Sequence, residues 1–326
     1  MRENTVRNYG FDNLKFFLML FVLLGHLLSF SKAPGADIIF RLLYLFHMPL
    51  FLFISGFFAK FVPKRTILPL LSIYVVFQFL YIFFERIALN TRSDFQFTQP
   101  YWILWYVLAL VFYHVLLPLY DVKTTGGRVA AVLVSLVLAV IVGFQDTVGY
   151  YLSLSRFFVF QPFFLMGYYF RRELPHIQQT LNAKPKVFLF FSIAVIAGAV
   201  LSLLCIWDSG ISKEMFYGAY GYSALTYGPG IRIKLLLSAI AWVFLFALIL
   251  RSYLSFRIPV ISGIGSRTLP VFLLHGFVLK LLEKSHPAFV DNWFGVIVVA
   301  LGCLLLFGNP IANAVVRALF YEPWER

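Results

Sequence analysis

The chain has 326 residues, of which 61% are hydrophobic and only 13% are charged, and its mean hydropathy is +0.86. Soluble domains carry about 25% charged residues, so this composition excludes a cytosolic enzyme, a disordered protein and a secreted disulfide scaffold. The net charge of +13 therefore first raises the question of which side of a membrane the Lys and Arg residues occupy.

Ten apolar runs approach the length of about 20 residues that a membrane-spanning helix needs. In chain order they cover residues 11–31, 38–59, 66–85, 101–119, 129–145, 155–170, 187–207, 233–250, 267–283 and 292–309. The stretch 310–321 is too short to span, and we expect it to lie along the surface or to prolong the tenth helix beyond a kink at Pro310. The predicted fold class is an all-α integral membrane protein of about ten transmembrane helices in a single bundle, with residues 1–326 forming one domain.

The basic residues are divided unevenly between the loops. More of them fall on the side of the two chain ends than on the opposite side. Because basic loops remain in the cytoplasm, both termini are predicted to be cytoplasmic. Topology then accounts for the net charge, so membrane lipid is the expected surrounding and no nucleic-acid partner is expected. The oligomeric state is open, with a homo-oligomer among the outcomes.

The first apolar run contains three ionisable residues, Asp12, Lys15 and His26. At about 100° per residue, His26 lies within about 20° of Lys15 and about 40° of Asp12 around the helix, so the three share one face. Ionisable groups are costly in lipid, so this face is predicted to look into the bundle. Lys15 and His26 are separated by about 16 Å along the axis, a gap that an extended chain such as the pantetheine arm of coenzyme A would bridge. The alternative is a buried ion pair and an unrelated histidine.

The second run adds further polar residues. His47 lies at a depth similar to that expected for His26, with Arg41 nearer the outer surface. Ser55 and Gly56 form a small patch that permits close approach of another helix. Packing is the favoured interpretation of this patch, and a site role for Ser55 is the alternative.

Later segments contain less specific candidates. Arg156 begins the sixth run and either stabilises an oxyanion or anionic acceptor, or extends to lipid headgroups. His275 lies near mid-depth in the ninth run and is a candidate for lining a cavity. The Gly- and Tyr-rich segment 208–232 is either a binding loop whose rings stack on sugars or part of the interfacial belt, to which Trp102, Trp105 and Tyr106 are also assigned. Histidines without a nearby pair of carboxylates are a poor metal site, so no metal is expected.

These residues form a pattern that resembles the membrane acyltransferase-3 family. The family pattern is D-x-x-K/R, then G-H, then R…F-H-x-P-L-F-x-x-x-S-G-F. The matching residues in this chain are Asp12, Lys15, Gly25, His26, Arg41, Phe46, His47, Pro49, Leu50, Phe51, Ser55, Gly56 and Phe57. The segments RFFVFQPFFLMGY, beginning at Arg156, and GIGSRTLPVFLLHG, containing His275, are similar to the fucose 4-O-acetylase-like subgroup. Lys15 departs from the Arg of many members, which keeps the charge but loosens bidentate phosphate contact.

The resemblance implies O-acylation, usually O-acetylation, of a cell-envelope carbohydrate in a bacterial plasma membrane, with acetyl-CoA as the cytoplasmic co-substrate. The family's essential histidine corresponds to His26, which acts as general base or transiently carries the acyl group, and its basic position corresponds to Lys15. The expected catalytic residues are His26, Asp12 and His47. The expected donor-binding residues are Lys15, Lys64 and Arg65. The expected acceptor- or oxyanion-binding residues are Arg41, Arg156, His275 and Ser55.

Two other functions fit the same residues. A secondary transporter of a small solute or acylated glycan also has many helices and a polar interior, but no internal repeat or carboxylate relay supports it here. A membrane anchor or assembly partner would use the polar residues structurally, so substitution of Asp12 or His26 would lower only stability and abundance. The sequence leaves open the acceptor sugar and the choice between acetyl and succinyl or another acyl group.

Overall fold

The computed structural model describes residues 9–91, 96–207, 210–253 and 256–325, and every regular element in these ranges is a helix. The all-α fold class is therefore confirmed. The chain divides into two compact units, one formed by Met1–Leu43 and Phe244–Val316 and the other by Tyr44–Val243 and Arg317–Arg326. The divisions fall within helices α2 (Ala36–Phe58), α9 (Pro229–Tyr253) and α13 (Pro310–Phe320).

Six helical stretches of the described residues are long and apolar enough to cross a membrane. They are Gly10–Phe30, Ala36–Phe58, Pro63–Ile87, Trp102–Tyr120, Thr125–Phe144 and Pro229–Leu248. Two bent pairs would add one span each: Pro259–Gly265 with Thr268–Ser285, bent by 78°, and Trp293–Phe307 with Pro310–Trp324, bent by 58°. The chain is thus a membrane protein, whereas the count of ten spans and the cytoplasmic termini stay predictions.

Prolines mark several helix boundaries and bends. Pro63, Pro185 and Pro259 each occupy the first turn of a helix, where the missing N–H carries no penalty. Pro310 follows the end of α12 (Trp293–Phe307), and the expected helix beyond it is present as α13, turned away at a sharp bend. The expected run 187–207 is interrupted at Leu203, which separates α7 (Pro185–Ser202) from a single turn, α8 (Leu204–Trp207).

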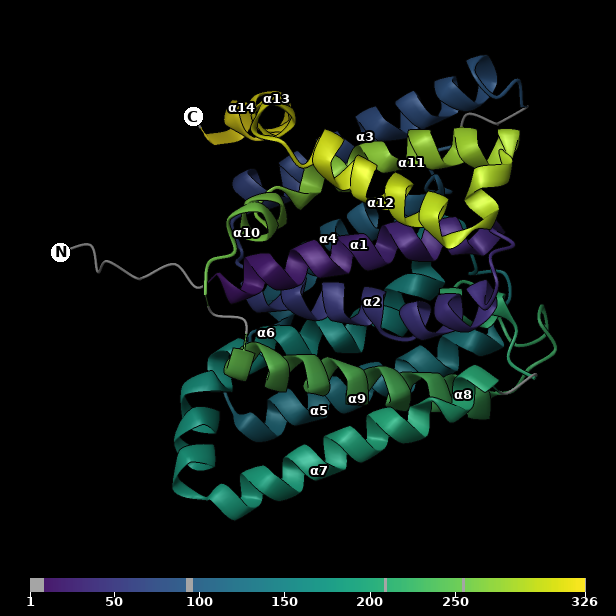
Figure 1. The fold of residues 1–326 in the computed structure, drawn as a ribbon. Helices are drawn as coiled ribbons and strands as arrows, with labels where there is room; N and C mark the ends of the chain where they lie inside the picture. Colours follow the sequence, from purple (N-terminus) through teal and green to yellow (C-terminus); the bar gives the residue numbers. More distant parts are fainter. Residues whose placement is uncertain (1–8, 92–95, 208–209, 254–255, 326) are drawn as a thin grey trace. The chain divides into compact units, whose positions relative to one another are not determined.

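The first unit is built around α1, which contacts α10, α11 and α12 (Figure 1). Its helices are α1 (Gly10–Phe30), α10 (Pro259–Gly265), α11 (Thr268–Ser285), the 3-10 turn η6 (Ala288–Asp291) and α12 (Trp293–Phe307). A Cβ atom added to Gly265 would lie 1.8 Å from the carbonyl oxygen of Asp12, so α10 approaches the α1 backbone directly. Asn13 donates to the carbonyl of Phe256 at 3.0 Å and accepts from Ser262 at 2.6 Å. These contacts fix the polar end of α1.

The second unit contains the remaining helices. They are α3 (Pro63–Ile87), α4 (Trp105–Leu116), α5 (Thr125–Ile141), α6 (Leu154–Ala183), α7 (Pro185–Ser202), α8 (Leu204–Trp207) and α14 (Glu322–Glu325), with 3-10 turns η1 (Trp102–Leu104), η2 (Leu117–Tyr120), η3 (Val142–Phe144), η4 (Tyr151–Ser153) and η5 (Lys213–Tyr217). Helix α6 is its organising element, since α4, α5 and α7 all contact it.

Helices α2 and α6 cross at two glycines. A Cβ atom on Gly56 would lie 1.9 Å from the carbonyl oxygen of Phe164, and one on Gly167 would lie 1.8 Å from that of Phe53. Both distances are far below any that a real Cβ adopts, so the backbones meet only because neither residue has a side chain. The packing interpretation of Gly56 is confirmed, and small residues at such crossings are typical of membrane helices.

Candidate active site

The polar end of α1 contains an ion pair. Nζ of Lys15 lies 2.9 Å from Oδ1 of Asp12, and the two side chains are 27% and 8% exposed respectively. The expected contact between residues three apart on a helix is therefore present. The partly buried carboxylate keeps the Lys15 ammonium close to the first turns of α1, where it remains accessible to an anion.

The other end of α1 brings two candidate residues together. The rings of His26 on α1 and His275 on α11 are stacked, with centroids 5.6 Å apart and planes inclined by 20°. His275 is fully buried, and its Nδ1 lies 3.0 Å from the carbonyl oxygen of Val271. A carbonyl only accepts, so Nδ1 of His275 carries a proton. Both histidines are predicted from the sequence as candidate site residues, but the stacking of their rings is seen only in the structure.

Arg41 has a partner that the sequence reading overlooked. Its Nε lies 2.7 Å from Oδ2 of Asp37, one turn earlier on α2. The Arg41 side chain is 14% exposed, whereas that of Asp37 is 50% exposed. The spacing of four residues between the acid and the base was a signal that could have revealed this pair.

His47 and Arg156 belong to one aromatic group in the second unit. The ring of His47 meets that of Tyr44 edge to face at 4.7 Å, and Tyr44 lies 5.4 Å from the ring of Tyr217. Nε of Arg156 donates to the backbone carbonyl of Tyr217 at 3.2 Å. Two candidates that are distant in sequence are therefore linked through two tyrosines that the sequence analysis did not single out.

Arg156 is enclosed by aromatic rings. Its guanidinium carbon lies 5.3 Å from the ring of Trp105 and 5.0 Å from that of Tyr150, and the residue is 8% exposed. The hydroxyl of Tyr150 in turn donates to that of Tyr220 at 3.0 Å. The alternative in which Arg156 extends to lipid headgroups is therefore wrong. The assignment of Trp105 to the interfacial belt is also wrong, because its ring is buried against this cation.

The Tyr-rich segment forms a packed cluster around Arg232. Its guanidinium carbon lies 5.1 Å from the Tyr222 ring and 5.7 Å from the Tyr227 ring, and both rings are buried. Nη2 of Arg232 also donates to the carbonyl of Tyr220 at 2.6 Å. These two rings are held inside the fold and do not form the sugar-stacking surface considered above, although residues 208 and 209 of that segment lie outside the described residues.

The three remaining candidates all belong to the second unit. Lys64 and Arg65 are exposed in the first turn of α3. Ser55 donates to the carbonyl of Phe51 at 2.9 Å and lies 2.7 Å from the hydroxyl of Tyr106, so it joins α2 to α4. In the ranges that the structure describes, no group of three His, Cys, Asp or Glu side chains could hold a metal ion.

Comparison with known proteins places the chain in a family. A family model described as an acyltransferase domain, that of the acyltransferase-3 family, matches residues 8–308. The nodulation protein NolL of Sinorhizobium fredii (strain NBRC 101917 / NGR234) is 25% identical over 352 residues, covering 97% of this chain and 90% of NolL. No solved structure matches the chain significantly. The match covers nearly the whole chain, so this protein is a membrane acyltransferase and belongs to the acyltransferase-3 family.

Proposed function

We propose that the protein transfers an acetyl or other short acyl group from cytoplasmic acyl-CoA to a hydroxyl of an envelope carbohydrate. The acceptor is extracytoplasmic or lipid-linked, and the membrane is the bacterial plasma membrane. The observation that carries the proposal is the stacking of His26 on α1 against His275 on α11, together with Lys15 near the opposite end of α1. A basic group and an imidazole at the two ends of one helix suit a long donor with a phosphate-bearing head and a reactive tail.

His26 is the proposed general base. It takes the proton of the acceptor hydroxyl as the hydroxyl oxygen attacks the thioester carbonyl, and the carbon–sulfur bond then breaks. The imidazolium returns the proton to the leaving thiolate, so no net proton is gained or lost. In the variant of this mechanism, a ring nitrogen of His26 attacks the thioester carbonyl, and CoA leaves as the thiol with the imidazole proton. The hydroxyl then takes the acyl group from the acyl-imidazole and returns its proton to the ring.

His275 orients the base in this proposal. The bond to the Val271 carbonyl fixes the ring of His275, and the stacking contact then limits the rotation of His26. Asp12 holds Lys15, which attracts the phosphates of the donor. His47 and Arg156, with their shared tyrosines, are proposed to bind the acceptor or the developing oxyanion.

The proposal is tested with purified protein in lipid nanodiscs and isotope-labelled acetyl-CoA. Binding of the donor, release of CoA and transfer of label to host-cell envelope glycans are followed for wild type, His26→Ala and Lys15→Ala. The expected result is turnover by wild type, donor binding without turnover by His26→Ala, and weak donor binding by Lys15→Ala. If wild type neither binds nor consumes acetyl-CoA or other acyl-CoAs, the donor assignment fails. Solute flux that does not depend on acyl-CoA would favour the transporter instead.

A further inference from the structure

A recess lies in the second unit where α2, η2 and α6 approach one another. Its volume is about 600 Å³, within the usual range of small-molecule sites. Three cations line it, Lys60, Arg171 and Arg172, together with a single carboxylate, Asp121. The positive-inside prediction places all four on the cytoplasmic side. We refer to this feature as the basic recess.

The cations of the basic recess are only partly neutralised. Nη1 of Arg172 lies 2.5 Å from Oδ1 of Asp121, in a pair whose side chains are 32% and 56% exposed. Such an exposed pair contributes little stability, so an incoming anion can replace the carboxylate. Within the described ranges, no ion pair is found for Lys60 or Arg171, and Arg171 makes a long contact of 3.4 Å with the carbonyl of Phe57.

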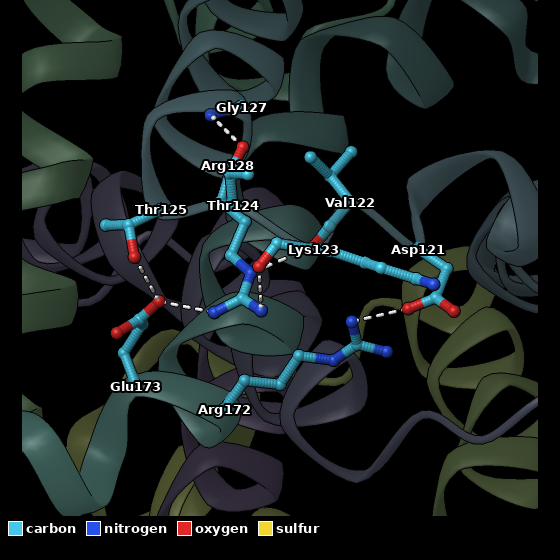
Figure 2. Close-up of polar contacts among 9 residues, drawn as sticks. All are labelled: Asp121, Val122, Lys123, Thr124, Thr125, Gly127, Arg128, Arg172 and Glu173. Carbon is cyan, nitrogen blue, oxygen red and sulfur yellow. Dashed lines mark hydrogen bonds and ion pairs between the residues drawn. The ribbon is translucent and has the colours of Figure 1, made fainter.

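The wall of the recess that carries Asp121 is held by a network of bonds (Figure 2). Arg128 on α5 donates to the carbonyls of Val122 at 3.0 Å and Lys123 at 2.9 Å, and pairs with Glu173 of α6. The hydrogen bond from Arg128 lowers the pKa of the Glu173 carboxyl, which therefore stays ionised at neutral pH. The segment before α5 is thus fixed to α6, one residue from Arg172.

The remaining lining favours a particular kind of anion. The Tyr168 hydroxyl accepts a bond from Arg172, and its ring lies 4.5 Å from the guanidinium carbon. Phe61, Leu117 and Pro118 add an apolar surface. Guanidinium groups match the geometry of phosphate oxygens, whereas apolar and aromatic faces suit a base or a sugar ring. An inorganic anion would use the cations and leave most of the volume unfilled.

We propose that the basic recess binds the phosphate-bearing nucleotide end of the acyl donor. This inference rests on the proposed function for the identity of the donor, and it adds residues of the basic recess to the donor-binding residues Lys15, Lys64 and Arg65. Phosphate enters the recess, contacts Lys60 and Arg171, and replaces Asp121 at Arg172. The negative charge of Asp121 therefore opposes phosphate binding. When no donor is bound, the ion pair with Asp121 keeps the Arg172 side chain in place.

The test measures the affinity of nanodisc-embedded protein for adenosine 3′,5′-bisphosphate and for CoA by calorimetry. Lys60→Ala combined with Arg171→Gln is expected to raise both Kd values at least about tenfold, since two charged contacts are lost. Asp121→Asn is expected to lower both Kd values, because it removes the negative charge that opposes phosphate binding. Lys123→Ala is the matched control, because it removes a neighbouring positive charge that does not line the recess. Arg171→Lys keeps the charge and should recover part of the affinity, and a thermal melt of each variant checks folding.

Each outcome separates this inference from the proposed function. If wild type transfers acetyl groups but the double variant binds CoA within about twofold of Lys123→Ala, the recess proposal is wrong and the function stands. If the double variant loses retention of anionic phospholipid while its Kd for CoA is unchanged, the recess is a headgroup site and the nucleotide proposal is again wrong. If wild type binds the bisphosphate through the recess yet consumes no acyl-CoA, the recess stands and the proposed function fails. If wild type binds neither adenosine 3′,5′-bisphosphate nor CoA, both the recess proposal and the proposed function are wrong.

Discussion

The imidazole rings of His26 and His275 lie almost parallel, 5.6 Å apart between centroids, although the two residues are 249 positions apart in the chain. One ring is fully buried and bonded to its own helix, whereas the other is partly exposed. A fixed ring beside an accessible one is an arrangement suited to a base that has to meet its substrate in one orientation. The two histidines therefore have different expected roles, which substitution can separate.

His26→Ala is expected to lower turnover of acetyl-CoA by a factor of about 10² to 10⁴, the usual contribution of a general base. The Kd for acetyl-CoA should change little, because the variant keeps the polar end of α1. Label transfer and donor binding, measured in the same nanodisc preparation, check this. Unchanged envelope O-acetylation in cells that carry only His26→Ala would end the catalytic assignment.

His275 is expected to act by positioning, so its variants should affect kcat more than KM. His275→Ala removes the stacked ring, and we expect kcat to fall about tenfold with the KM for acetyl-CoA nearly unchanged. His275→Phe restores an aromatic ring without ring nitrogens and should recover part of kcat. Equal losses in the Ala and Phe variants would instead indicate that a ring nitrogen of His275 acts directly on the substrate.

The ion pair of Asp12 and Lys15 should contribute to both stability and donor binding. Because the pair is partly buried, Asp12→Asn is expected to lower the free energy of unfolding by about 1–2 kcal/mol, between the values for exposed and buried pairs. Lys15→Ala should raise the KM for acetyl-CoA in addition. Thermal melts and steady-state kinetics of both variants check this, and a stability loss with unaltered KM would support the purely structural interpretation of the pair.

The sequence predicted the membrane helices and one local ion pair, because both depend on residues close together in the chain, although the equally local pair of Asp37 and Arg41 was missed. Apolar runs gave the positions of α1 to α5 and α9, and helical geometry predicted the contact between Asp12 and Lys15. The sequence did not predict the contacts between distant segments. The stacking of His26 on His275 and the enclosure of Arg156 by Trp105 depend on how helices pack, which periodicity within one helix does not encode.

The errors have a common physical cause. Composition places Trp105 at the membrane interface, where aromatic residues are frequent, and offers either the interface or a sugar-binding loop for the tyrosines of 208–232. In the structure Trp105, Tyr222 and Tyr227 pack against arginines inside the fold, because a buried guanidinium is stabilised by aromatic faces. Composition identifies residue types that are common at a membrane interface, but the same aromatic rings also pack against a cation inside the fold.

The crossing of α2 and α6 should be intolerant of any side chain. Gly56→Ala or Gly167→Ala places a methyl group where a carbonyl oxygen already lies, so the helices must separate, with a loss of about 1–3 kcal/mol or more. Gly302→Ala on α12 is the matched control, because nothing lies within 4 Å of the added Cβ. Thermal melts in detergent compare the three variants. Equal melting temperatures for Gly56→Ala and the control would mean that the helices do not approach as closely as described.

Asp291 should make the stability of the first unit depend on pH in the acid range. Its Oδ1 accepts the backbone N–H of Lys32 at 2.8 Å, and its Oδ2 lies 3.1 Å from Nε2 of His286, so it joins the loop after α1 to the loop after α11. The bond from Lys32 lowers the pKa of Asp291 from its ordinary value of 3.8. A carboxyl whose pKa is lower in the folded state stabilises fully above the unfolded value and loses that contribution as the pH falls through the folded value.

The comparison that isolates this effect is wild type against Asp291→Asn, melted in detergent from pH 7 to pH 3. The variant keeps an oxygen for the Lys32 N–H but lacks the charge, so it should be less stable by an amount that is constant from pH 7 to about 5. Below about pH 4 the unfolded wild-type chain takes up the proton first, so the difference between the two melting temperatures should narrow as the pH falls toward the folded-state pKa of Asp291. A difference that already changes between pH 6 and 7 would mean that protonation of Asp291 is not the cause of the effect.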